Sequence, residues 1–188
     1  LYSSAASDVY KRQQWGFSHF FPANTISAHV TRMGKRHLKM AIDVALSGAF
    51  GIDLALDKAT AEERAQIADA VKLYKERIRP LVMHGELYRL VSPYESPLAS
   101  LSYVSTDKQK AVVYFYQTKD GNEPRVMLGG LDAHKKYRVE EVSLAKGVTS
   151  RFPANGKVFT GAELMEKGLE NPLNTQFESA VLILVANN

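Results

Sequence analysis

The feature that most constrains this chain is the amphipathic segment at residues 59–80, ATAEERAQIADAVKLYKERIRP. Thr60 followed by Glu63 has the spacing of a capping box, in which two residues satisfy each other's backbone amides at a helix N-terminus. Apolar side chains then recur at helical spacing, at Ile67, Val71, Tyr74 and Ile78. Pro80 disfavours a helical residue before it, so we expect the helix to end there. Such a helix must bury its one apolar stripe against another layer of the protein.

Two apolar runs precede this helix and predict β-strands. Val44–Leu46 in MAIDVALSGAFG breaks at Ser47-Gly48, which is typical of a buried strand that enters a glycine-containing loop. Upstream, GFSHFFPANTISAHV ends in a second run, Ile26–Val30. Successive βα units predict a parallel sheet. Two strands cannot bury a parallel sheet on both faces, so we expect a truncated unit that needs further strands.

After residue 83 the pattern changes to short β-rich runs. They are ELYRLVSP, SLSYVST, KAVVYFYQTK, RVMLGGL, KKYRVEEVSL and SAVLILVAN. Turn signals such as Asp120–Asn122 and Gly129-Gly130 separate several of them, which predicts an antiparallel β-sandwich over residues 83–188. Residues 159–172 predict a short helical turn or a loop within it. Because residues 84–188 are long enough to bury a core of their own, we expect them to fold alone, whereas residues 14–79 alone should be aggregated or molten.

The first residues of the chain have the sequence expected of a translated sequencing artefact rather than of a natural N-terminus. Residues 3–13, SSAASDVYKRQ, can be back-translated in frame into a transposase-type sequencing adapter. We therefore interpret residues 1–13 as a library scar, outside the fold. The remaining domains are then a βα part at residues 14–82 and a β-rich part at residues 83–188.

Composition and motifs exclude several classes of function. The net charge of +4 is mild and forms no basic stripe with interleaved aromatics, so we expect no nucleic-acid partner. The absence of cysteine excludes disulfides and thiolate metal sites. The sequence has no run of about 18 apolar residues, so it predicts no membrane-spanning helix. No zinc, dinucleotide or phosphate-binding motif occurs in the sequence. The compartment stays open.

Three stretches, in this order and spacing, carry a family resemblance: FFPANTISAHV, ALSGAFGIDL and the IRPLV, GELYRL and SP run at residues 78–93. Together they resemble the C-terminal part of glycoside hydrolase family 36, the bacterial α-galactosidases. The resemblance is specific over residues 14–103; beyond that, only the strand pattern supports it.

The resemblance implies the C-terminal end of a (β/α)₈ barrel followed by an antiparallel β-sandwich. It places residues 16–30 at the seventh barrel strand and residues 44–51 at the eighth. The implied parent is a retaining enzyme that removes terminal α-galactose from oligosaccharides of the raffinose or melibiose type. It uses two aspartates, both expected upstream of residue 14, so no catalytic residue is assigned here. The resemblance implies no cofactor and no metal. The oligomeric state of the parent stays open, with a homo-oligomer as one alternative.

Barrel active sites lie at the carboxyl ends of the strands. On that basis His29, Ser47 and Gly48 are candidate substrate-binding residues. His29 can instead satisfy buried backbone groups, and Ser47-Gly48 can simply form a tight turn. Trp15 is most simply a core residue, with a sugar platform as the alternative.

A second class of function is a non-catalytic carbohydrate-binding or structural β-module, with residues 86–188 as its working part. Another glycosidase family with the same layout is a third. The sequence does not separate them, because most loops that would read the sugar are not in the chain.

Overall fold

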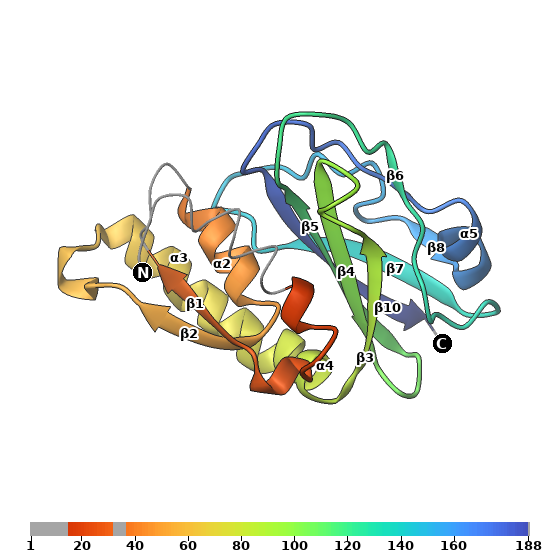
Figure 1. Ribbon diagram of the computed structural model, residues 1–188, viewed down its shortest axis with the longest axis horizontal. Coiled ribbons are helices and arrows are strands. Elements are labelled where there is room, and N and C mark those ends of the chain that lie inside the picture. The colour runs from red at the N-terminus through yellow and green to blue at the C-terminus, as the bar shows by residue number, and fades with distance from the viewer. Residues whose placement is uncertain (1–14, 32–36, 188) are drawn as a thin grey trace.

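The computed structural model describes residues 15–31 and 37–187 of the chain. The adapter interpretation of residues 3–13 therefore concerns residues outside the described ones. The chain mixes helices and strands, with the helices and a parallel strand pair first and a large antiparallel sheet second (Figure 1).

The first part contains a parallel pair of strands joined through a helix. Its elements are η1 (Ala23–Thr25), β1 (Ser27–Thr31), α2 (Leu38–Ala45), β2 (Ala49–Asp53) and η2 (Leu56–Lys58). β1 pairs with β2 in parallel, with His29 opposite Gly51. The predicted parallel βα arrangement is confirmed as a pair of adjacent strands.

The predicted strand at Val44–Leu46 is wrong. Val44 and Ala45 end helix α2, Leu46 caps it, and the strand begins only at Ala49. The physical reason is that residues 40–45 of α2 are all buried, because the helix contacts β1 on one side and strands of the large sheet on the other. An apolar run of three residues at the buried end of a short helix cannot be told from a buried strand by periodicity.

The long helix begins as predicted. It comprises α3 (Ala61–Leu73), the π-helical turn η3 (Tyr74–Ile78) and α4 (Arg79–His84). Both bonds of the capping box form: the Thr60 amide donates to Glu63 Oε2 at 2.8 Å, and the Glu63 amide donates to Thr60 Oγ1 at 3.1 Å.

Pro80 does not end the helix as predicted. It lies in the first turn of α4, directly after the π-helical turn. Proline is tolerated in the first turn of a helix, where its missing N–H leaves no bond unmade. The widened turn therefore lets the chain pass the proline and remain helical to His84.

The second part is built on one six-stranded antiparallel sheet, ordered β3-β4-β5-β10-β7-β8. The strands are β3 (Glu86–Val91), β4 (Leu98–Val104), β5 (Lys110–Gln117), β7 (Lys136–Val142), β8 (Val158–Thr160) and β10 (Ser179–Asn187). A separate two-stranded ladder joins β6 (Arg125–Val126) to β9 (Leu169–Glu170), and α5 (Gly161–Glu166) lies between β8 and β9 in the chain. The antiparallel prediction is confirmed, but the second layer is this small ladder with α5 and loops.

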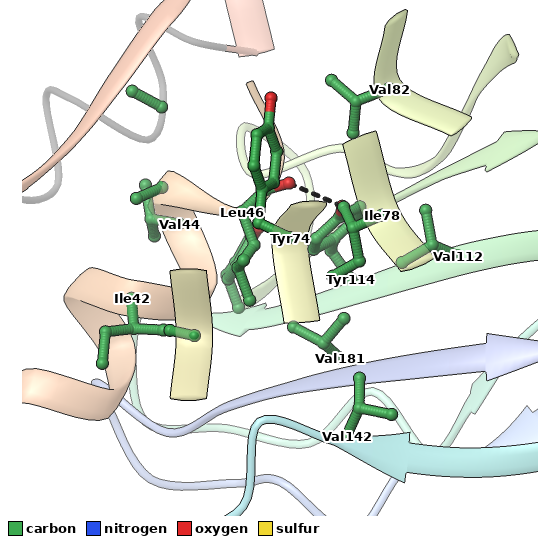
Figure 2. Packing of buried hydrophobic residues seen from close by; sticks show 14 of the residues in the cluster. Ile42, Val44, Leu46, Tyr74, Ile78, Val82, Val112, Tyr114, Val142 and Val181 are labelled. Atoms are coloured by element: carbon green, nitrogen blue, oxygen red, sulfur yellow. Dashed lines mark hydrogen bonds between the residues drawn. The ribbon is translucent and has the colours of Figure 1, made fainter. Parts of the chain in front are cut away.

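Each face of the large sheet is covered by a different hydrophobic cluster. Alternate residues of β4, β5 and β10 pack against α2, α3, η3 and α4 on one face. The intervening residues pack against β6, β9, α5 and nearby loops on the other. Figure 2 shows Ile42, Leu46 and Ile78 from the helices facing Tyr114 and Val181 from the sheet. The helices and the sheet therefore share one core.

Within the described residues, the structure has no helix that is long and apolar enough to cross a membrane.

Candidate functional site

The parallel pair β1–β2 has one covered face and one open face. On the covered face Ala28 and Val30 are fully buried, and Phe50 stacks on Tyr74 of η3 with ring centroids 5.3 Å apart. Side chains alternate between the two faces of a strand. The paired register therefore puts six residues on the opposite face, which we call the open face: Ser27, His29, Thr31, Ala49, Gly51 and Asp53.

The open face is small and polar, and its centre is His29 lying across Gly51. A Cβ atom built on Gly51 would come within 2.0 Å of His29 Cδ2 and 2.6 Å of Nε2. Only glycine therefore lets the imidazole lie over the neighbouring strand. The His29 side chain is exposed, so its imidazole is accessible to a molecule that lies on the open face.

Thr31 and Asp53 are paired at the carboxyl ends of the two strands. This is the end of a parallel sheet at which ligands bind in barrel and open α/β folds. The open face carries one carboxylate, that of Asp53, and hydrolysis through an acid and a nucleophile needs two. Among the described residues, no group of three or more His, Cys, Asp or Glu side chains could hold a metal ion. These residues can bind hydroxyl groups, but they do not form a complete catalytic set.

Ser47 and Gly48 lie away from this end. They form the turn between α2 and β2, at the amino end of β2. Ser47 Oγ donates to the backbone oxygen of Val44 at 2.8 Å, and a Cβ on Gly48 would come within 2.6 Å of the backbone oxygen of Ile26. Their geometry is that of a tight turn in close contact with β1. The expectation that they follow a strand fails because the preceding run is a helix.

Trp15 is buried, 6% exposed, within the core shared by the helices and the sheet. Its ring contacts His19 edge to face at 6.5 Å. The core interpretation of Trp15 is confirmed.

Sequence reasoning missed a buried carboxylate, Asp43, between the helices and the sheet. Asp43 lies in α2 with a fully buried side chain. It accepts hydrogen bonds from Lys39 Nζ at 2.5 Å, Ser143 Oγ at 2.5 Å and Ser179 Oγ at 2.7 Å. Buried charges are paired or coordinated, so an aspartate within the apolar run MAIDVAL was a signal of such a cluster.

Three buried tyrosines on the helix-facing side of the sheet were also missed. The hydroxyls of Tyr103, Tyr114 and Tyr116 donate to the backbone oxygens of Ser47 (3.0 Å), Leu46 (2.8 Å) and Asp43 (2.9 Å). Burial raises the pKa of all three tyrosines, so they stay protonated donors. The alternation in YFYQ, which puts Tyr114 and Tyr116 on one face of β5, was the available signal.

Comparison with known families gives two matches that together cover most of the chain. A family model described as "Melibiase" matches residues 1–85, and one described as "Glycosyl hydrolase family 36 C-terminal domain" matches residues 98–184.

Relatives with known names are α-galactosidases. The chain is 29% identical over 196 residues to probable alpha-galactosidase G of Aspergillus terreus, an alignment that covers 98% of this chain and 25% of that protein. It is 33% identical over 168 residues to alpha-galactosidase AgaA of Geobacillus stearothermophilus, covering 85% of this chain and 21% of that protein.

Solved structures give the same result. The crystal structure of the GH36 α-galactosidase AgaB from Geobacillus stearothermophilus matches with a TM-score of 0.80 and 31% identity, over 96% of this chain and 24% of that chain. A variant of AgaA in complex with raffinose matches with a TM-score of 0.81 and 30% identity over the same shares. The chain thus spans about a quarter of the length of the proteins it matches.

Proposed function

Because this chain belongs to glycoside hydrolase family 36, we propose that it is the C-terminal part of a retaining α-galactosidase that hydrolyses terminal α-galactosides. The observation that carries the proposal is the two-faced parallel pair β1–β2. Helices cover one face of the pair, and the open face is small and polar. A strand of a (β/α)₈ barrel has this arrangement: helices cover its outer face, its inner face points into the barrel, and the substrate binds at the carboxyl ends of the strands.

We infer that residues 14–82 are the last βα units of a (β/α)₈ barrel, with β1 and β2 as its seventh and eighth strands. Residues 83–188 then form the C-terminal antiparallel β-sandwich domain, with β6–β9 as its smaller second sheet. The parallel register of β1–β2 supports the first assignment, and the antiparallel order β3-β4-β5-β10-β7-β8 supports the second.

In this proposal the chain contributes substrate-binding residues on one side of the active site, and it does not contribute the catalytic carboxylates. The two catalytic carboxylates of a retaining glycosidase lie about 5–5.5 Å apart, and we place both upstream of residue 14. His29, with Thr31 and Asp53 at the carboxyl ends of the strands, would face the galactoside, where polar side chains can hydrogen-bond sugar hydroxyls. Ser47 and Gly48 are assigned to the turn that holds β2.

The proposed substrates are oligosaccharides of the raffinose or melibiose type, and no cofactor is involved. The support comes from relatives: variants of AgaA from Geobacillus stearothermophilus have been crystallised in complex with raffinose and with stachyose.

A replacement experiment tests the function. The matching C-terminal part of AgaA would be exchanged for residues 15–188 of this chain, and hydrolysis of raffinose and of a chromogenic α-galactoside would be measured. We expect activity in the chimera and none in AgaA truncated at the same position. His29→Ala in the chimera should lower kcat/KM, with Tyr94→Phe, an exposed tyrosine of the second part, as the control. A folded but inactive chimera would contradict the proposal.

The alternative function is a carbohydrate-binding or structural β-module at residues 86–188. Measurements on this chain and on the chimera distinguish it from the proposed function. Both faces of the large sheet are occupied by core side chains, which leaves no apolar sheet face for a sugar. Retention of this chain on an α-galactoside resin, together with an inactive chimera, would favour the module.

A further inference from the structure

Hydroxyl groups from the large sheet, and from Ser143 directly after β7, converge on one short stretch of α2 backbone and on one carboxylate. Their acceptors are the backbone oxygens of residues 43, 46 and 47 and the carboxylate of Asp43. We call the donors the α2 clamp: Tyr103, Tyr114, Tyr116, Ser143 and Ser179.

The clamp satisfies groups that a helix end normally leaves open. The last four carbonyls of an α-helix have no partner within the helix. Asp43 lies in the last four residues of α2, Leu46 caps the helix, and Ser47 follows the cap in the turn. In most helices water or a glycine-containing motif supplies the donors at this end. Here Tyr116 of β5 donates to the backbone oxygen of Asp43, Tyr114 of β5 to that of Leu46 (Figure 2, dashed line) and Tyr103 of β4 to that of Ser47. Tyr74 of η3 adds a bond to the backbone oxygen of Gly48 at 2.9 Å.

The same turn sets where β2 begins. Immediately after the clamped residues, the amide of Ala49 donates to the backbone oxygen of Ile26 at 2.9 Å. Gly48 lies too close to Ile26 to accept a Cβ atom. The turn therefore delivers β2 to β1 in one register.

That register decides what the open face presents. In the observed register His29 is opposite Gly51, and only a residue without a Cβ can lie beneath its ring. A shift of β2 by one residue would bring Phe50 or Ile52 under the imidazole and turn the open face over. The position of His29 thus depends on a turn that the sheet holds.

We propose that Tyr103, Tyr114, Tyr116 and Asp43 are positioning residues for the reaction: through the α2–β2 turn they fix the register of β2 and the place of His29 on the open face. This role rests on the proposed function, in that the open face is taken to be part of the substrate site. The second part of the chain then acts as a brace for the last barrel strand rather than as an independent module.

Amide hydrogen exchange of the full chain, followed by mass spectrometry or NMR, tests the proposal. Tyr114→Phe removes one clamp hydroxyl and keeps the ring. We expect residues 46–53 to exchange about fivefold faster, the effect of one lost hydrogen bond on a local opening. Amides of β5 and β10 should keep their protection.

The matched control is Tyr137→Phe on the opposite face of the same sheet. Tyr137 is fully buried, and its hydroxyl donates to the backbone oxygen of Lys108 at 2.8 Å and accepts from the Asp132 amide at 3.0 Å. Its loss should accelerate exchange near residues 108 and 132 and leave residues 46–53 unchanged. Ser179→Ala, which removes one donor to Asp43, should repeat the effect of Tyr114→Phe.

Two outcomes would overturn the proposal. One is normal protection of residues 46–53 in both Tyr114→Phe and Ser179→Ala. The other is equal acceleration throughout the sheet, which would make the clamp a general contributor to stability. Neither measurement needs activity, so an inactive chimera with the expected exchange pattern would refute the proposed function and leave the clamp intact.

Discussion

Removing the helical part should unfold the sheet, contrary to what the length of residues 84–188 suggests. Eight side chains larger than alanine would lose their cover on the helix-facing side: Leu101, Tyr103, Val112, Tyr114, Tyr116, Val142, Val181 and Ile183. Full exposure of such a side chain costs about 1.5–3 kcal/mol. If half of that burial is lost, the cost is roughly 6–12 kcal/mol, which is comparable to the whole stability of a domain, about 5–15 kcal/mol.

The assay is calorimetry and dye binding on residues 84–188 beside residues 15–188. We expect the shorter protein to bind a hydrophobic dye and to melt without a cooperative transition. The full chain serves as the control for expression and buffer. A sharp transition in residues 84–188, with an enthalpy of about 0.7 kcal/mol per residue, would refute the reasoning that the two parts share one core.

Four further predictions follow from individual contacts. The chain alone should not hydrolyse a chromogenic α-galactoside above buffer, since one carboxylate on the open face cannot supply two roles; turnover by pure chain would contradict this. Asp43→Ala should lower the free energy of unfolding, measured by urea unfolding, by about 3 kcal/mol, because the buried Ser179 hydroxyl, the partly buried Ser143 hydroxyl and Lys39 lose their acceptor; Ser150→Ala, on another carboxylate, is the comparison. Glu140→Gln should cost at most about 1 kcal/mol at pH 7, since its bidentate pair with Arg77 is half exposed. Arg77 lowers the pKa of Glu140 from 4.5, so this contribution is present above pH 4.5 and is lost as the pH falls through the lowered pKa; a difference from the original protein that persists at pH 2 would argue against the pair. Gly51→Ala should displace the exposed His29 ring with little loss of stability, seen as a changed His29 NMR signal; an unchanged signal would mean that the ring does not lie over residue 51.

Local signals in the sequence were reliable where neighbouring residues decide the structure. The capping box at Thr60 and Glu63 formed because its two bonds lie within four residues. The stripe from Ile67 to Ile78 is buried as its spacing predicts, with Ile67, Tyr74 and Ile78 in the core. The antiparallel strands after residue 85 form in the β-rich runs that the turn signals separate, and the three family stretches identified the lineage.

The tertiary structure decided the features that depend on contacts between segments far apart in the sequence. Val44–Leu46 is helical rather than extended because β1 and the large sheet bury it from both sides. The helix continues through Pro80 instead of ending there, because a π-helical turn precedes the proline. His29 was found from the sequence, but its placement over Gly51 needed the register of two strands. The contacts of Asp43 with Ser143 and Ser179 join residues 100 and 136 positions apart. Periodicity within a segment reports which side chains share a face, whereas the partner of that face is chosen by the whole fold.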